Sequence, residues 1–248
     1  MARQEKLRSV GLARALSKLG YCSRSQAGEM IARGRVRLNG KVRRDAEAAV
    51  HLGRDRIEVD SELVREQAKI YLMLNKPRGV VTTASDEKGR RTVYEFLPAQ
   101  PWVGPVGRLD QASEGLLLLT NDTEWGARLA DPWGGIEKVY HVQVGTTKAD
   151  GLVEQVVSGM VERGETLRAK RARVIRRGQR NSWLEIVLEE GKNRHIRRML
   201  AALDTEVLRL VRVGIGGLCL GKLAKGCVRA LSAEEKRDLE RAIRTREP

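Results

Sequence analysis

The stretch from Gly107 to Asp122, GRLDQASEGLLLLTND, constrains the fold more than any other part of this chain. Gly107 and Gly115 allow backbone angles that other residues avoid, so the loop between them can turn tightly and approach a ligand closely. The leucines at 116–119 predict a short, fully buried strand, which the turn formers Asn121 and Asp122 end. The sequence therefore predicts a rigid loop at the entrance of a buried strand.

An aspartate and an arginine share this loop, and two interpretations of the pair stay open. Asp110 lies two residues after Arg108, and a carboxylate held on such a platform in a basic chain favours chemistry on nucleic acid. The two side chains can instead form a structural ion pair, an arrangement commoner than a catalytic pair. The spacing alone does not choose between the two.

The charge of the chain indicates the class of its partner. Its 248 residues include 47 Lys and Arg against 32 Asp and Glu, which gives a net charge of +15 and an isoelectric point of about 10.2. This excess favours a polyanionic partner, and the longest leucine run is far too short to cross a bilayer. We therefore expect nucleic acid, and no membrane, as the partner.

Cysteine and histidine are too few and too scattered to form a metal site. The three cysteines lie far apart without a C-x-x-C pair, and the three histidines lack metal-ligand spacing. No phosphate-binding glycine loop or dinucleotide motif occurs, so the sequence predicts neither a cofactor nor a metal. The first ten residues are polar and basic and do not predict a signal peptide, so we expect a cytoplasmic protein.

Residues 9–66 predict a small basic domain. Apolar residues recur at helical spacing from Leu12 onward, and Gly20 follows where that helix would end. Ser23 and Gln26 form a capping-box pattern before a second helix, which we expect to stop at Gly34. This module is separate from the loop around residue 110.

Cations gather on the second helix and on the hairpin that follows it. The Asn39-Gly40 pair predicts a hairpin turn, and an alternating segment at 57–59 predicts a closing strand. Between residues 1 and 44 there are twelve Lys and Arg but two Asp and Glu. Each cation alone is an ordinary solvated charge, whereas the cluster suits the phosphates of structured RNA. The clustered cations are Arg24, Arg33, Arg35, Arg37 and Lys41.

Residues 69–248 predict a larger second domain. An apolar segment at 70–74 predicts a strand that a Lys-Pro turn ends. By itself, Lys76 is as consistent with an ordinary turn lysine as with a functional one. Residues 139–144 alternate and predict another strand. On that strand Tyr140 is either a core aromatic or a stacking partner for a base.

Arginines also gather at the start of a helix that follows a predicted strand at 183–188. Arg194, Arg197 and Arg198 lie off the apolar stripe of this helix, where a guanidinium can hold a carboxylate through two hydrogen bonds. Between 166 and 180 there are seven Lys and Arg and no acidic residue. Like charges repel unless a polyanion screens them, so we expect a second RNA contact in that segment.

Several motifs together resemble those of the RsuA/RluB-type pseudouridine synthases. Residues 107–119 are similar to the central signature of that family, G-R-L-D-x-x-(S/T)-x-G-L-(L/I)-(L/V), over about a dozen consecutive positions. KPRG at 76–79, KVYHV at 138–142 and EGKNRHIRRM at 190–199 resemble its other motifs. Residues 16–41 are similar to the S4-like RNA-binding domain.

The resemblance implies roles for individual residues. Asp110 would be the catalytic aspartate, Tyr140 would stack on the target uracil, and Arg197 would pair with Asp110. Arg108 would fill the place that the extruded base leaves, and Lys76 would lie near the active cleft and bind the substrate RNA.

Three neighbours of Arg197 belong to the same motif. Arg194 and Arg198 are expected to bind substrate RNA. His195 stands where the family commonly has glutamine, and we do not interpret it as a general base.

The resemblance also implies a fold and an activity. The expected class is α+β, with a small α/β S4-like RNA-binding domain followed by a pseudouridine synthase catalytic domain with a mixed, mostly antiparallel central sheet flanked by helices. The expected activity is the site-specific isomerisation of uridine to pseudouridine in ribosomal RNA. We expect the enzyme to be a monomer that also binds pre-ribosomal particles. The segment 212–223 favours 23S RNA as the substrate, with 16S RNA as the alternative.

Two other classes of protein stay open. A non-catalytic RNA-binding ribosome-assembly factor would retain the pocket without the activity, and tritium release from 5-tritiated uridine RNA separates it from an isomerase. A hydrolase would use Asp110 and Glu114 as paired carboxylates, and free uracil would then be the product.

Overall fold

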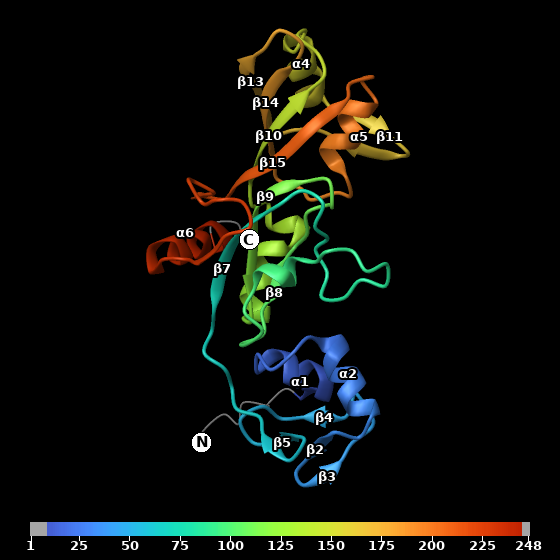
Figure 1. Ribbon diagram of the computed structural model, residues 1–248, viewed down its shortest axis with the longest axis vertical. Coiled ribbons are helices and arrows are strands. Elements are labelled where there is room, and N and C mark those ends of the chain that lie inside the picture. Colours follow the sequence, from blue (N-terminus) through green and yellow to red (C-terminus); the bar gives the residue numbers. More distant parts are fainter. Residues whose placement is uncertain (1–8, 245–248) are drawn as a thin grey trace, which may run out of the picture. The chain divides into compact units, whose positions relative to one another are not determined.

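A computed structural model describes residues 9–244 of the chain, which forms two compact units (Figure 1). The first unit contains residues up to Tyr71 together with Pro98–Gly104 and Thr120–Glu124, and the second contains the rest. Two later segments thus belong with the N-terminal residues, and the predicted domain limits of 9–66 and 69–248 stay a prediction.

Two consecutive helices, α1 (Leu12–Lys18) and α2 (Arg24–Ala32), form the helical part of the first unit. The chain turns between them at Gly20, whose φ of 76° lies in the left-handed region that glycine adopts without strain. The Ser23 hydroxyl accepts a hydrogen bond from the Gln26 amide, and the Gln26 side chain accepts one from the Ser23 amide. The predicted capping box is therefore confirmed.

Short strands complete the first unit: β1 (Val10–Gly11), β2 (Val36–Leu38), β3 (Lys41–Val42), β4 (Ala49–Val50), β5 (Ile57–Val59) and β6 (Glu62–Leu63). Four of them form an antiparallel sheet in the order β3-β2-β5-β6, and β1 pairs with β4. Asn39 and Gly40 have φ values of 51° and 78° and join β2 to β3, so the predicted hairpin turn is confirmed.

A single apolar core joins the helices of the first unit to its strands. Leu12 and Leu16 of α1, Ile31 of α2 and Val36 of β2 are all fully buried in it. Removing such side chains from water is the main force that holds a unit of this size together. The cations of α2 and of the hairpin stay outside this core.

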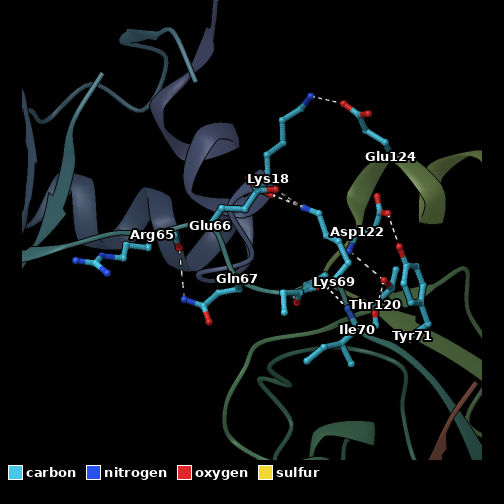
Figure 2. Close-up of polar contacts among 12 residues, drawn as sticks. Lys18, Arg65, Glu66, Gln67, Lys69, Ile70, Tyr71, Thr120, Asp122 and Glu124 are labelled. Carbon is cyan, nitrogen blue, oxygen red and sulfur yellow. Dashed lines mark hydrogen bonds and ion pairs between the residues drawn. The ribbon is translucent and has the colours of Figure 1, made fainter. Parts of the chain in front are cut away.

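Side-chain hydrogen bonds fasten the segment that follows β6 within the first unit (Figure 2). The buried Asn121 side chain accepts a hydrogen bond of 2.8 Å from the Ile70 amide and donates one of 2.8 Å to the Ala68 carbonyl. The Lys69 ammonium donates a hydrogen bond of 3.2 Å to the Lys18 carbonyl. The segment is therefore held in place at several points along its length.

The second unit is built on a nine-stranded sheet in the order β13-β14-β10-β15-β9-β7-β17, with β16 beside β15 and β8 beside β9. The strands are β7 (Tyr71–Lys76), β8 (Gly104–Val106), β9 (Glu114–Thr120), β10 (Lys138–Val144), β13 (Arg171–Arg177), β14 (Ser182–Leu188), β15 (Val207–Ile215), β16 (Leu218–Cys219) and β17 (Val228–Ala230). A separate hairpin joins β11 (Met160–Glu162) to β12 (Glu165–Leu167).

The sheet is mixed and mostly antiparallel, as expected. β9 and β15 run parallel, with Arg212 opposite Gly115, whereas β10 runs antiparallel to both β14 and β15. Every residue of β9 is buried, which confirms the buried strand predicted from its leucines. The loop that precedes β9 therefore lies beside β15, one strand away from β10.

Helices flank the sheet and complete the α+β class. They are α3 (Thr123–Ala130), α4 (Asp150–Ser158), α5 (His195–Ala201) and α6 (Ala233–Arg244), with 3-10 turns η1 (Val93–Phe96) and η2 (Pro132–Gly134). Val156 of α4 and Met199 of α5 share one core with Val142 of β10 and Ile186 of β14. Between residues 9 and 244, no helix has both the length and the apolar character needed to cross a membrane.

Candidate active site

A cavity of about 190 Å³ lies in the second unit, beside the loop that precedes β9. Four segments contribute polar side chains to its wall: Arg108 and Asp110 from the loop, Tyr140 from β10, Arg194 from the turn before α5, and Arg212 from β15. These segments meet because β10, β15 and β9 are consecutive neighbours in the sheet. Three motifs that lie far apart in the sequence thus converge on one cavity.

Backbone contacts hold the Asp110 loop in place. Gly107 has a φ of 68°, so the left-handed turn expected there is confirmed. The Thr82 hydroxyl donates a hydrogen bond of 2.8 Å to the Leu109 carbonyl, and the Ser113 amide donates one of 3.0 Å to the Asp110 carbonyl. The Asp110 side chain, 37% exposed, lines the cavity from this fixed backbone.

Lys76 supports the same loop from inside the protein. Its side chain is fully buried, and its ammonium donates hydrogen bonds of 3.1, 3.1 and 2.8 Å to the carbonyls of Pro77, Asp110 and Ser113. Burial lowers the pKa of Lys76 to about 8, although the charges of Asp110 and Glu114 oppose this shift. This placement corrects the expectation that Lys76 binds RNA, because an ammonium with no exposure cannot reach a phosphate.

Two arginines of the 190–199 motif approach the Asp110 loop in different ways. Arg194 has a left-handed backbone, with φ 48° and ψ 31°, and its Nη1 lies 3.8 Å from Asp110 Oδ2. Arg197 instead donates hydrogen bonds to the carbonyls of Ala112, at 3.0 Å, and Val207, at 3.4 Å. Among the residues described, Arg194 therefore takes the ion-pair position that we expected for Arg197.

Arg197 is still electrostatically linked to the carboxylate. Burial and the neighbouring charge of Arg194 lower the pKa of Arg197, and the charge of Asp110 opposes them. By bonding the Ala112 carbonyl, Arg197 also fixes the backbone two residues after Asp110. Its position is that of a residue that shapes the loop.

Tyr140 lies in β10 between two neighbouring strands. It is opposite Arg212 of β15 and Ile186 of β14 in the sheet register. Its half-buried ring packs against the apolar core of the unit and also lines the cavity. A ring anchored in this way suits stacking on a planar base.

His195 is a buried, uncharged member of the cavity wall. Its side chain is nearly inaccessible, and among the described residues neither ring nitrogen has a hydrogen-bond partner. Burial lowers the pKa of His195 to about 4, so the ring is neutral near pH 7. A general base works best with a pKa near the working pH. A pKa of about 4 does not suit that role, in agreement with the expectation that His195 is not a general base.

Arg212 is a member of the cavity wall that our sequence reasoning missed. Its Nε donates a hydrogen bond of 2.7 Å to the Leu116 carbonyl, and the residue is 5% exposed. The strand pattern carried a signal, because Arg212 alternates with Val211 and Val213 and so shares a face with the buried Leu210. A charge on a buried face is unusual and identifies a position that needs explanation.

Glu114 forms a structural ion pair. The buried carboxylate lies 2.7 Å from Arg209 and 2.6 Å from Lys225. Burial raises the pKa of Glu114, but the hydrogen bonds from Arg209 and Lys225 outweigh burial and lower it. Glu114 does not line the cavity that contains Asp110, so the paired-carboxylate hydrolase loses its second acid.

Arg198 is likewise engaged within the protein. Its guanidinium lies 2.5 Å from the Glu162 carboxylate and 2.6 Å from that of Glu165, and its side chain is 18% exposed. These two carboxylates neutralise the charge that we expected to bind RNA. Arg198 therefore joins α5 to the β11–β12 hairpin.

Carboxylates from distant segments also neutralise much of the basic segment 166–180. The pairs are Lys170 with Glu137 and Glu189, Arg171 with Glu137, Arg173 with Glu185, and Arg177 with Asp150. Contrary to our expectation, the segment does not need a polyanion to screen it, and the second RNA contact there stays a prediction. The segment's partners come from β14, from α4 and from the turns before β10 and after β14, which the local sequence does not reveal.

The cations predicted on the first unit are all exposed but differ in how they are bonded. Arg35 forms an ion pair with Asp60, and the Arg37 guanidinium donates a hydrogen bond of 3.2 Å to the carbonyl of the hairpin turn. Within residues 9–244, no ion pair engages the other three, which are Arg24, Arg33 and Lys41. These three remain the best placed to meet a phosphate.

Known protein families match both units. The family described as RNA pseudouridylate synthase matches residues 70–202, and the S4 domain family matches residues 10–57. The first match includes the Asp110 loop, Tyr140 and the start of α5.

Individual relatives match along almost the whole chain. The ribosomal large subunit pseudouridine synthase B of Bacillus subtilis strain 168 is 36% identical over 231 residues, which cover 92% of this chain and 94% of that protein. An uncharacterized RNA pseudouridine synthase of Aquifex aeolicus strain VF5 is 36% identical over 241 residues, covering 94% and 95%. A crystal structure of a pseudouridylate synthase matches with a TM-score of 0.66 and 29% identity, covering 93% of this chain and all of that one.

Proposed function

The chain belongs to the RNA pseudouridylate synthase family and is an isomerase, and we propose that it converts a specific uridine of large-subunit ribosomal RNA into pseudouridine. The observation that carries the proposal is the cavity that brings together Asp110 and Tyr140. The rigid backbone of the loop keeps the carboxylate at one edge of this cavity.

The reaction moves the bond between uracil and ribose without any net change in composition. The N1–C1′ bond breaks, the base turns, C5 bonds to C1′, the C5 proton leaves, and N1 takes up a proton. Neither oxidation nor group transfer to a second molecule occurs, so the reaction needs no cofactor.

Asp110 is the group that starts the reaction. Three first steps fit an ionised carboxylate in this cavity: attack on C1′ of the ribose, attack on the uracil ring, and removal of a ribose proton. The guanidinium of Arg194 at 3.8 Å and the charge of Arg197 place positive charge beside that carboxylate. Tyr140 stacks on the base as it turns.

The target uridine must leave its stack to reach the cavity. Arg108 is exposed at the edge of the cavity, where its side chain fills the place that the base leaves. Arg194 contacts the neighbouring phosphates, and Arg24, Arg33 and Lys41 hold more distant phosphates of the same RNA. Arg35 and Arg37 add positive charge to the same surface.

The Bacillus subtilis relative is a ribosomal large subunit pseudouridine synthase, which supports large-subunit RNA as the substrate. The segment 212–223 favours the same RNA, and small-subunit 16S RNA is the alternative. Such an enzyme works as a monomer in the cytoplasm, on ribosomal RNA that is free or within pre-ribosomal particles. Mapping pseudouridine in both ribosomal RNAs, from cells with and without the gene, identifies the target.

Replacement of the carboxylate tests the proposal directly. Asp110→Asn keeps the size of the side chain but removes its charge, so we expect tritium release from 5-tritiated uridine RNA to fall by about 10⁴-fold or more. RNA affinity, measured by filter binding, should change by less than about threefold, because phosphate contacts dominate binding.

An exposed aspartate supplies the matched control. Asp204 lies in the turn after α5 with a φ of 48°, a conformation that asparagine also tolerates, so Asp204→Asn should release tritium at the wild-type rate. Full activity in Asp110→Asn would remove the assignment of the site. RNA binding by the wild-type protein without tritium release from any ribosomal RNA would identify it as a non-catalytic assembly factor.

A further inference from the structure

Arg212 carries a buried charge whose hydrogen-bonding capacity is only partly used. It has five N–H donors in a fixed planar arrangement. Its Nε is bonded to the Leu116 carbonyl at 2.7 Å, whereas its Nη2 is buried and has no hydrogen-bond partner among the residues described. An unused donor on a side chain that is 5% exposed is costly unless a ligand completes it.

No carboxylate forms an ion pair with Arg212 within the described part of the chain. The nearby carboxylate of Glu114 is bonded to Arg209 and Lys225 instead. The charge of Arg212 even contributes to lowering the pKa of the buried Lys76, so two cations lie close together behind the cavity. A buried, uncompensated cation favours a ligand that carries or develops negative charge.

We infer that Arg212 donates a hydrogen bond to a carbonyl oxygen of the extruded uracil and stabilises the negative charge that this base acquires during the reaction. The inference rests on the proposed function and adds a catalytic residue to it. Arg212 lines the same cavity as Asp110 and lies opposite Tyr140 in the sheet. A base stacked on Tyr140 is therefore beside the guanidinium.

Each of the three possible first steps places negative charge on the uracil. Attack of Asp110 on C1′ breaks the N1–C1′ bond, and the electron pair passes to N1 and is shared with O2 and O4. Removal of the ribose 2′-proton expels the same uracil anion and leaves a C1′–C2′ double bond. Attack on C6 of the base moves the C5–C6 electron pair toward O4. A donor aimed at a carbonyl oxygen stabilises the charge in all three cases.

The surroundings of Arg212 favour a base over a phosphate. Leu118, Leu210 and Ile215 line the cavity with it, and a phosphate would lose its hydration among such side chains. Arg108 and Arg194 are exposed at the same cavity and offer phosphates a hydrated contact. An extruded base has flat faces that pack against apolar side chains, and its two carbonyl oxygens can accept hydrogen bonds from a guanidinium.

Arg212→Met tests the inference, because methionine keeps most of the length but neither the charge nor the donors. With a large-subunit RNA fragment that contains the mapped target, we expect the single-turnover rate of pseudouridine formation to fall by about 100-fold or more. The Kd for the same RNA should stay within about threefold, since the contact strengthens only as charge develops.

Arg209→Met is the matched control on the same strand. Arg209 is bonded to Glu114 and does not line the cavity, so its loss should lower the melting temperature without slowing the folded enzyme. Arg212→Lys keeps the charge, and it replaces Arg212→Met in the assays if the methionine variant does not fold. Circular dichroism and the melting temperature show which variants are folded.

Sulfur-substituted RNA separates a contact with the base from a structural role. Sulfur accepts hydrogen bonds weakly, so 2-thiouridine and 4-thiouridine each weaken one of the two possible contacts. The intrinsic effect of sulfur on the reaction is the same for both proteins and cancels in a double-mutant cycle. We expect one of the two substitutions to slow the wild-type enzyme at least about tenfold more than it slows the Arg212 variant.

Three results would overturn the inference. The first is an Arg212 variant within about threefold of the wild-type rate, and the second is a rise in Kd as large as the fall in rate. The third is the absence of coupling at both thio positions. If the wild-type enzyme is active, any of these results disproves the role of Arg212 alone. If the wild-type enzyme is inactive, the proposed function is disproved as well.

Discussion

The buried ammonium of Lys76 donates a hydrogen bond of 3.1 Å to the backbone carbonyl of Asp110. The end of β7 and the loop before β9 are thereby joined through one side chain, which also bonds the Ser113 carbonyl at 2.8 Å. The carboxylate in the cavity thus depends on a lysine that never contacts solvent.

Lys76→Met should destabilise the protein and slow the reaction together. Methionine removes one hydrogen bond from each of three carbonyls, and that of Asp110 keeps only its bond from the Ser113 amide. One unsatisfied buried group costs about 1–3 kcal/mol, so the free energy of unfolding should fall by about 2 kcal/mol or more. Urea denaturation measures this loss, and tritium release below the unfolding transition measures the rate. Lys88→Met, at an exposed loop lysine, should change neither, and equal behaviour of the two variants would contradict a supporting role for Lys76.

His195 should make the folded protein sensitive to mild acid. Burial lowers its pKa from 6.5 to about 4, so between these values the unfolded chain binds a proton that the folded protein refuses. The free energy of unfolding should therefore fall as the pH falls from 6.5 toward 4, by up to about 3 kcal/mol.

The variant His195→Gln isolates this contribution, because an amide does not titrate. Carboxylates titrate in both proteins, so the difference between wild type and variant, measured by urea denaturation across this pH range, reports on His195 alone. Parallel stability curves for the two proteins would show that His195 takes up protons equally well in the folded and unfolded states.

Local signals made much of the fold predictable. The capping box at Ser23 and the Asn39-Gly40 turn are formed by residues close in sequence, and their geometry follows from backbone preferences that act over a few residues. The leucines at 116–119 could belong only in a core, and they form a fully buried strand. Such features depend little on the rest of the chain.

Long-range contacts limited the prediction of the site. Lys76 and Arg198 are cations in motifs, and only the folded chain reveals that backbone carbonyls or carboxylates already engage them. Arg212 lies in a strand whose partners, β9 and β10, come from distant parts of the sequence. A residue's availability to a ligand is decided by such contacts, and a motif does not encode them.

Gly115 should tolerate no side chain. Its φ is 102°, and a Cβ atom there would lie 2.2 Å from the Arg212 carbonyl oxygen in the adjacent parallel strand. Gly115→Ala should therefore cost more than about 4 kcal/mol, because two backbones would have to separate. Gly107→Ala is the control, since its φ is 68° but nothing lies within 4 Å, and strain alone costs about 1–2 kcal/mol. Similar unfolding midpoints in urea for the two variants would contradict the close approach of β9 and β15.

Arg24, Arg33 and Lys41, the three clustered cations that no ion pair engages within residues 9–244, should contribute strongly to the salt dependence of RNA binding. The triple variant Arg24→Ala, Arg33→Ala, Lys41→Ala should weaken affinity and reduce the slope of log K against log salt concentration by about 2 to 3, because each lost phosphate contact removes slightly less than one unit. Fluorescence anisotropy with a ribosomal RNA fragment, titrated at several salt concentrations, measures both quantities. Catalysis at saturating RNA should be kept, since none of the three lines the cavity.

A second triple variant with the same change in net charge tests whether position matters. Arg90, Arg91 and Arg241 are exposed but paired with Asp86, Glu95 and Asp238 respectively. Their replacement by alanine removes three positive charges from elsewhere on the chain, so the slope should change by less than about 1 if phosphates bind at the N-terminal cations. Equal slopes for the two triple variants would mean that RNA responds to the net charge of the chain, and the N-terminal unit would then lose its special role in binding.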